Sequence, residues 1–164
     1  MIGNFERCLA ITLQWEGGVS NDAADPGRLT KWGITHANYD AWRVSKRLPT
    51  QSVRAMTLDE CKAIYRRDYW DAMSCDTLPP GYDLCVFDAA VNSGTGRART
   101  WRAGYPTIDA FQAARLSFLQ HLGHLWRVFG RGWGRRVTGI KAQAHAMEPK
   151  AVNDNARTMI GIAA

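Results

Sequence analysis

Apolar residues recur at three- and four-residue intervals along most of this chain, which is the spacing of one face of an α-helix. The pattern predicts helices over residues 4–16, 36–48, 58–71, 82–91 and 108–129. Thr35 and Thr57 stand directly before the second and third of these helices, where a hydroxyl can cap the first turn. The pattern therefore predicts an all-α fold.

The predicted helix over 82–91 is apolar nearly all round, which is typical of a helix at the centre of a helical domain. Asp88 interrupts this apolar sequence. A carboxylate in such a place needs partners that compensate its charge, because an unpaired buried charge is very unfavourable. We expect these partners to be arginine side chains or backbone N–H groups.

Residues 16–35 break the helical pattern. In the preceding helix the inward face is expected to include Phe5, Cys8, Leu9, Thr12 and Trp15. Glu16 is expected at the C-terminal end of that helix, followed by two glycines and a loop of turn-forming residues.

Three carboxylates, Glu16, Asp22 and Asp25, stand close together in this stretch. Hydrolysis of a glycosidic bond needs one carboxyl group that is protonated, to donate to the leaving oxygen, and a second that is ionised. Such residues also cap turns, so their spacing alone leaves a catalytic and a structural interpretation open.

The C-terminal third combines a long predicted helix with a basic segment. Residues 108–129 are predicted as one amphipathic helix, and 130–136 as a basic, glycine-rich turn that can hold an anionic polymer. His121 and His124 form an i, i+3 pair, but no third ligand stands nearby in the sequence, so we predict no metal site. Residues 148–164 are predicted to be a poorly packed tail.

Length and charge restrict the interpretation only in part. The chain has 164 residues, of which 46% are hydrophobic, which suffices for one domain with one core. Its formal net charge of +6 favours a polyanionic partner: a cell wall, a nucleic acid or a membrane surface. Seven tryptophans are many for this length, and we expect a minority of them to stack against sugars.

The four cysteines and the N-terminus suggest a protein without disulfides or leader. Cys8, Cys61, Cys75 and Cys85 lack metal-ligand spacing, and most stand among apolar residues, so we expect reduced core thiols. Glu6 interrupts the N-terminal sequence before an apolar core develops, so no signal peptide is expected. No segment is long enough to span a membrane.

Three blocks in the sequence resemble the muramidases of glycoside hydrolase family 108. The first comprises Trp15-Glu16-Gly17-Gly18, Asn21-Asp22, Asp25-Pro26-Gly27 and Thr30-Lys31-Trp32-Gly33-Ile34, the second is Tyr65–Asp71, and the third is Phe87–Gly94. Phe129–Trp133 is also similar to the closing segment of that family, so that the resemblance covers most of residues 5–140. Val19 and Arg28 depart from the pattern, in which an aromatic residue and a glycine are usual.

The resemblance implies a single lysozyme-like helical domain with a catalytic loop after the first helix. It implies cleavage of the β-1,4 bond between N-acetylmuramic acid and N-acetylglucosamine, with Glu16 as general acid and without a cofactor. A similar Glu, Asp, Thr arrangement in phage T4-type lysozymes favours Asp25 as the second carboxylate, with Thr30 positioning the water and Asp22 as the alternative. Trp32, His36 and Asn92 are expected to bind substrate.

The resemblance also sets expectations for organisation and setting. Residues 1–95 would form the catalytic region, 96–147 a shortened peptidoglycan-binding region packed on it, and 148–164 the tail. We expect a monomer that binds peptidoglycan, does not insert stably into membranes and has no nucleic-acid partner. It would be made in the bacterial cytoplasm and act in the periplasm with the help of a holin, or be carried in a virion with tail or internal proteins.

Two other interpretations stay open from the sequence alone. The fold could serve as an inactive wall-binding or virion structural module, against which the intact Glu16 argues. The arginine-rich C-terminal third could instead bind nucleic acid, in which case Glu16 would be irrelevant and binding would weaken steeply with salt.

Overall fold

The computed structural model describes residues 3–17, 19–21 and 29–149, with seven α-helices and a small sheet in these ranges. The longer elements are α1 (Phe5–Leu13), β1 (Val19–Asn21), β2 (Leu29–Lys31), β3 (Ile34–Thr35), α2 (His36–Ser45), α3 (Leu58–Tyr65), α4 (Tyr82–Ser93), α5 (Thr95–Gly104), α6 (Ile108–Gln120) and α7 (His124–His145). Short helical turns join some of them: η1 (Val53–Ala55), η2 (Arg66–Asp71) and η3 (Cys75–Thr77). The predicted mostly helical, lysozyme-like fold class is confirmed.

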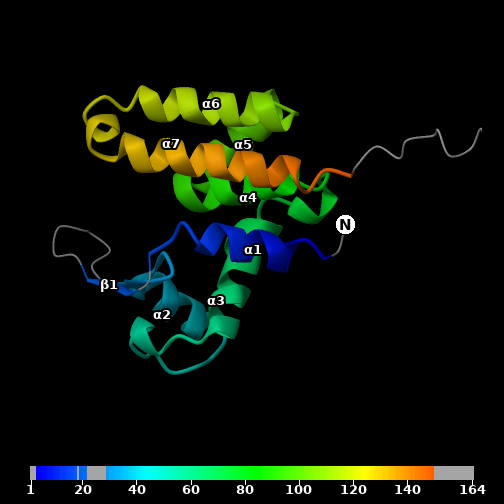
Figure 1. Ribbon diagram of the computed structural model, residues 1–164. Helices are drawn as coiled ribbons and strands as arrows, with labels where there is room; N and C mark the ends of the chain where they lie inside the picture. The colour runs from blue at the N-terminus through cyan, green and yellow to red at the C-terminus, as the bar shows by residue number, and fades with distance from the viewer. Residues whose placement is uncertain (1–2, 18, 22–28, 150–164) are drawn as a thin grey trace, which may run out of the picture.

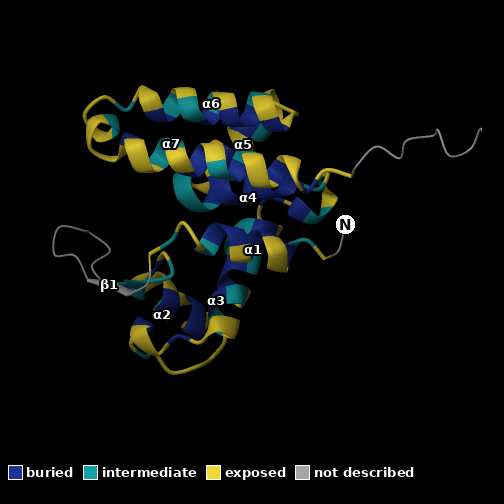
Figure 2. Cartoon of the chain, in the orientation of Figure 1, coloured by how far each residue is buried: buried dark blue, intermediate teal, exposed yellow. Residues whose placement is uncertain are grey.

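Helix α4 is the centre of the molecule, because α1, α5, α6 and α7 all contact it. Figure 1 shows α7 between α6 and α4, with α1 on the other side of α4 and with α2, α3 and the strands forming a separate lower part. Nine consecutive residues of α4, from Tyr82 to Ala90, are buried, as the apolar sequence predicts. Figure 2 shows the burial concentrated along α4 and the faces turned toward it.

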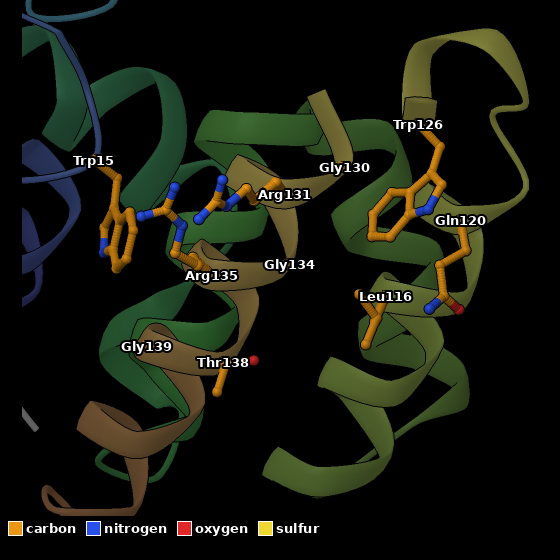
Figure 3. Close-up of a pocket in the computed structure, with 10 residues that line it drawn as sticks. All are labelled: Trp15, Leu116, Gln120, Trp126, Gly130, Arg131, Gly134, Arg135, Thr138 and Gly139. Carbon is orange, nitrogen blue, oxygen red and sulfur yellow. The ribbon is translucent and has the colours of Figure 1, made fainter. Parts of the chain in front are cut away.

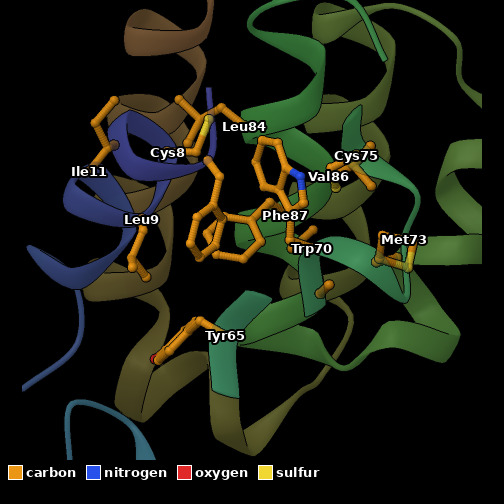
Figure 4. Close-up of a cluster of buried hydrophobic side chains, with 14 of the residues drawn as sticks. Cys8, Leu9, Ile11, Tyr65, Trp70, Met73, Cys75, Leu84, Val86 and Phe87 are labelled. Atoms are coloured by element: carbon orange, nitrogen blue, oxygen red, sulfur yellow. The ribbon is translucent and has the colours of Figure 1, made fainter. Parts of the chain in front are cut away.

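An aromatic cluster joins α1, η2 and α4 (Figure 4). Phe5, Trp70 and Phe87 meet edge to face, with ring centroids 5.5 Å apart for Phe5 and Trp70 and 5.4 Å apart for Trp70 and Phe87. Such pairs contribute about 0.5–1.5 kcal/mol each beyond the burial of their area. The cluster fixes the N-terminal end of α1 relative to α4.

All four cysteines lie in the described ranges, buried and unpaired, which confirms the prediction of reduced core thiols. Burial raises the pKa of Cys61 to about 12, so this thiol stays protonated near neutral pH. Within the same ranges no helix combines the length and the apolar character that crossing a membrane requires.

The first helix is shorter than predicted. α1 ends at Leu13, so Glu16 lies beyond the helix, and Trp15 is 38% exposed and does not face inward. The tertiary contact explains the difference, because the Trp15 ring packs on Gly139 of α7, where an added Cβ would lie 2.6 Å from it. Reaching α7 requires the chain to leave the helical path before Trp15.

The loop predicted after the first helix contains a small antiparallel sheet in the order β1-β2-β3. Ser20 pairs with Thr30, and Thr30 pairs with Thr35. Strands of two or three residues are too short to show the alternation by which a sequence reveals a strand. The two predicted caps after this loop are confirmed: Thr35 caps α2, and Thr57 and Glu60 form a capping box at α3.

The prediction of one helix over 108–129 followed by a turn over 130–136 is wrong. The chain turns at Gly123, with φ of 56°, and residues 130–136 lie inside the 22-residue helix α7. Glycines within a helix cost about 1 kcal/mol each relative to alanine. At Gly130 the packing of the Trp126 ring offsets this cost, because the ring lies so close that an added Cβ would be 2.5 Å away.

Gly81 directly precedes α4 and lies against the end of α7. Substitution of this glycine tests how tightly α7 packs there. Gly81 and Gly94 have nearly the same φ, 88° and 84°, but an added Cβ would lie 2.2 Å from the Ala144 carbonyl oxygen only at Gly81. Either substitution to alanine should cost about 1–3 kcal/mol for the backbone conformation. Gly81→Ala should cost a further ~1–3 kcal/mol because it overpacks the contact with α7. Urea denaturation of the two variants measures the difference, and equal losses would contradict this packing.

Candidate active site

Glu16 is held just beyond the end of α1 by an ion pair with α7. Its Oε1 lies 2.7 Å from Nη1 of Arg136, and the Glu16 side chain is 17% exposed. Arg136 itself is buried. The pair therefore links the N-terminal and C-terminal parts of the chain at a carboxylate that retains access to solvent.

The turn between β2 and β3 closes the other side of Glu16. Trp32 and Gly33 form a two-residue turn, both with positive φ, 50° and 74°, a combination typical of tight hairpins. An added Cβ on Gly33 would lie 2.6 Å from Oε2 of Glu16. Only glycine therefore fits at position 33, for its backbone conformation and for its contact with the carboxylate.

Tyr65 connects this turn to the core. Its hydroxyl donates a hydrogen bond to the carbonyl oxygen of Trp32, at 2.7 Å. Burial, and after it the negative charge of Glu16, raise the pKa of Tyr65, so the phenol remains a neutral donor. Trp32 is a bulky residue in the left-handed region, and this hydrogen bond helps to hold its unfavourable conformation.

Behind Glu16 lies a chain of buried charges. Asp88 of α4 is fully buried and accepts hydrogen bonds from Nε and Nη2 of Arg136, the shortest at 2.8 Å. Nη1 of Arg115 from α6 lies 2.8 Å from the other oxygen of Asp88. The expectation that Asp88 would need arginine partners is confirmed, and the four alternating charges from Arg115 to Glu16 balance one another.

This arrangement keeps Asp88 ionised in the core. Burial opposes ionisation, but the charges of Arg115 and Arg136 outweigh it and hold the pKa of Asp88 below its usual value. Burial lowers the pKa of Arg136, but Asp88 and Glu16 reverse the effect, so that the pKa of this guanidinium is raised. Arg136 is thus a permanent cation beside Glu16.

A groove of about 460 Å³ opens beside this pair. Asn92, at the end of α4, lines it, and its side-chain oxygen accepts a hydrogen bond from Nη2 of Arg115 at 3.0 Å. The other lining residues are Trp15, Phe129, Gly132, Trp133, Arg135 and Arg136. The volume is in the range of about 300–1,000 Å³ that is usual for ligand pockets.

A second, more open groove of about 670 Å³ adjoins the first, with which it shares Trp15 and Arg135. It crosses α7 over Gly130 and Gly134. Figure 3 shows the side chain of Trp15 on one side of α7 and that of Trp126 on the other.

The remaining predicted site residues are placed differently. Thr30 lies half-buried in the middle strand of the sheet whose turn contacts Glu16. Both ring nitrogens of His36 have partners: Nδ1 accepts from the Val53 N–H, and Nε2 lies 3.2 Å from Asp40. His36 thereby joins α2 to η1. Asp22 and Asp25 lie outside the described residues.

Sequence reasoning missed Arg136 and the contact of Gly33 with Glu16. Arg136 was predicted in a surface turn, because glycines flank it on the N-terminal side. The buried Asp88 signalled that an arginine was needed, but a chain with 21 Lys and Arg does not reveal which one. Within the described ranges, no three His, Cys, Asp or Glu side chains are grouped to hold a metal ion.

Replacement of Asp88 by asparagine should be strongly destabilising, because it leaves Arg115 and Arg136 with an uncompensated buried charge. We expect a loss of about 3–5 kcal/mol of unfolding free energy at pH 7. Since the folded-state pKa of Asp88 is lowered, its contribution is present above the unfolded pKa near ~3.9 and disappears as pH falls through the folded value.

Denaturation of the wild type and of Asp88→Asn at pH 7 and at progressively lower pH measures this effect. The free energies of unfolding of the two proteins should converge in acid. Asp71→Asn is the matched control, because Asp71 pairs with Arg66 at the surface and its loss should cost at most about 1 kcal/mol. A similar loss in both variants would argue against a central role for Asp88.

Comparison with known proteins places the chain in a family. The sequence model of the family described as Glycosyl hydrolase 108 matches residues 9–94. Among solved structures, "Structure of Brucella abortus SagA" is similar, with a TM-score of 0.75 and 29% sequence identity over 92% of this chain and 99% of that chain. No curated protein matches the chain. Because the family match spans more than half of its residues, the chain belongs to glycosyl hydrolase family 108, the peptidoglycan hydrolase family that its motifs indicate.

Proposed function

We propose that the protein is an N-acetylmuramidase, which hydrolyses the β-1,4 bond between N-acetylmuramic acid and N-acetylglucosamine in peptidoglycan. The observation that carries the proposal is the position of Glu16. Its carboxylate is held between Arg136 and the backbone of Gly33, and both Arg136 and the adjacent Trp15 line a groove with aromatic walls. A fixed but accessible carboxyl group whose partner lines such a groove suits general acid catalysis.

The two oxygens of Glu16 have different surroundings, which supports this role. Oε1 accepts from Arg136, so the proton of the acid form belongs on Oε2, the oxygen near Gly33. In the reaction, Glu16 gives this proton to the glycosidic oxygen as the bond from the anomeric carbon breaks. Arg136 then faces the carboxylate that has just become negative, and its charge stabilises that product state.

The groove offers the contacts that a glycan strand needs. Trp15 and Trp133 present flat rings against which the apolar faces of sugars can stack, and Asn92 offers an amide for their hydroxyl and N-acetyl groups. Arg135 is exposed at the rim, where a carboxylate of the wall polymer can reach it. The groove and Glu16 together fit an acetylated, anionic polysaccharide.

The second carboxylate in our proposal is Asp25, with Asp22 as the alternative. It either activates the water that attacks the anomeric carbon or attacks that carbon itself. Thr30 would position the water from the middle strand of the sheet. Trp32 would line the sugar side of the β2–β3 turn.

Glu16→Gln should lower the hydrolysis of purified sacculi by more than about 100-fold, since general acid catalysis typically supplies 10²–10⁴-fold. The assay follows the clearing of turbidity and the appearance of reducing N-acetylmuramic acid. Asp25→Asn should have a comparable effect and Asp22→Asn a small one, and circular dichroism checks that each variant is folded. If a folded wild type releases no reducing ends, the inactive wall-binding or structural module becomes the better interpretation.

Gly33→Ala should reduce the same activity by about 10–100-fold, because the new methyl group displaces the Glu16 carboxylate and small misplacements of a catalytic group are costly. Gly123→Ala is the matched control, with a positive φ of 56° but with no heavy atom within 4 Å of the added Cβ. Equal activities of the two folded variants would show that the contact between Gly33 and Glu16 does not matter for catalysis.

A further inference from the structure

The net charge of the chain is concentrated in one hairpin. Between Asp109 and Glu148 there is no acidic residue, whereas six residues are lysine or arginine. This segment comprises most of α6 and α7, and its charge of +6 equals the net charge of the whole chain. In the remaining residues the positive and negative charges are equal in number. A charge so concentrated produces a positive field on one side of a molecule.

Only some of these cations are available to a partner. Arg115 and Arg136 are buried against Asp88, and Lys141 pairs with Asp109. The other three, Arg127, Arg131 and Arg135, are exposed and form no ion pair with any described residue. They stand at four-residue intervals, so they form a single stripe from the first turn to the middle of α7.

Large apolar side chains are exposed beside this stripe. Leu125 is 45% exposed, Val128 57% and Phe129 51%, and they make up three of the eight large hydrophobic residues that are exposed in the described ranges. All three lie in the first two turns of α7. Clustered apolar exposure of this kind marks a surface that binds something.

The place of these residues makes them accessible to a broad surface. Figure 1 shows the turn between α6 and α7 at one end of the molecule, and Figure 2 shows that the neighbouring first turns of α7 are largely exposed. Leu125, Arg127 and Val128 therefore project from the tip of a helical hairpin and line neither groove, whereas Phe129 and Arg131 stand at the borders of the two grooves. A flat partner can contact the apolar residues and the arginines at the same time.

We propose that this basic apolar surface, formed by Leu125, Arg127, Val128, Phe129 and Arg131, docks on the surface of a bilayer that contains anionic phospholipids. Arginines beside apolar residues on one helix are typical of helices that lie in the interface of a membrane. The arginines would bind lipid phosphates, while Leu125 and Val128 would enter the boundary between head groups and acyl chains. This contact is peripheral and needs no membrane-spanning helix.

The aliphatic residues favour a bilayer over a polymeric partner. A nucleic acid or a wall polymer would be attracted by the arginines, but it would gain little from Leu125 and Val128 on a convex surface. A bilayer uses both kinds of side chain, because it offers phosphates above an apolar layer. The charge and the apolar exposure are thus explained by one partner.

Docking would also place the catalytic groove near the bilayer. Phe129 belongs both to this surface and to the groove beside Glu16. A molecule held in this way would have its groove close to the membrane surface, where it would meet the wall polymer nearest to that membrane.

The test is co-sedimentation of the full chain with two kinds of vesicle. One kind is phosphatidylcholine alone, and the other contains roughly 30% of the anionic lipid phosphatidylglycerol. The wild type should bind the anionic vesicles and lose binding with added salt. Val128→Gln should weaken binding about tenfold, whereas Val44→Gln, which changes an equally exposed valine on α2, should not.

The role of charge has its own pair of variants. Arg127→Gln should weaken binding to the anionic vesicles about fivefold, the usual contribution of one basic residue at such a surface. Arg7→Gln removes the same charge from an exposed position on α1 and should leave binding unchanged.

Hydrolysis of lipid-free sacculi separates this proposal from the muramidase. Val128→Gln and Arg127→Gln should hydrolyse sacculi as the wild type does, which also shows that they are folded. The proposal is overturned if the wild type does not bind anionic vesicles, or if Val128→Gln and Val44→Gln bind them equally. Weakened binding of Val128→Gln to sacculi, with unchanged vesicle binding, would instead identify a wall-binding surface.

Discussion

The buried Asp88 carboxylate is the interaction on which the rest of this structure depends. An ionised group at the centre of an apolar helix is tolerable only if cations reach it, and they come from two other helices, α6 and α7. The charge of Asp88 is therefore compensated only when the C-terminal hairpin is packed on α4. One of these cations, Arg136, also binds Glu16, so the same requirement that organises the core fixes the candidate catalytic group.

Close contacts at two glycines also position the candidate site, in addition to the ion pairs. Gly33 lets the turn between β2 and β3 approach Glu16, and Gly139 lets the Trp15 ring pack on α7. In both places a side chain would separate two segments that are far apart in the sequence. The site is thus defined as much by the absence of side chains as by the carboxylate itself, and this makes its geometry sensitive to small changes.

Helix α7 serves both sides of the molecule. Its inner face supplies Arg136 to the buried charges, whereas its outer face presents arginines and apolar side chains to the surroundings. Arg136 lies outside the residues that the family model matches, 9–94. The candidate site therefore depends on a C-terminal helix that its N-terminal motifs do not include.

Patterns in the sequence predict the helical fold class, the burial of α4, the caps at Thr35 and Thr57 and the need of Asp88 for arginine partners. These features follow from local spacing and from the cost of burying an unpaired charge, both of which a single chain records. Three features become visible only in the folded molecule: the glycine-rich segment 130–136 is helical, Trp15 leaves the first helix, and Arg136 is the partner of Glu16. The position of Trp15 and the pairing of Arg136 with Glu16 depend on contacts between segments distant in the sequence, which a local pattern does not record. In the glycine-rich segment the Trp126 ring packs on Gly130, four residues further along the same helix, and this contact offsets the low helix propensity of glycine.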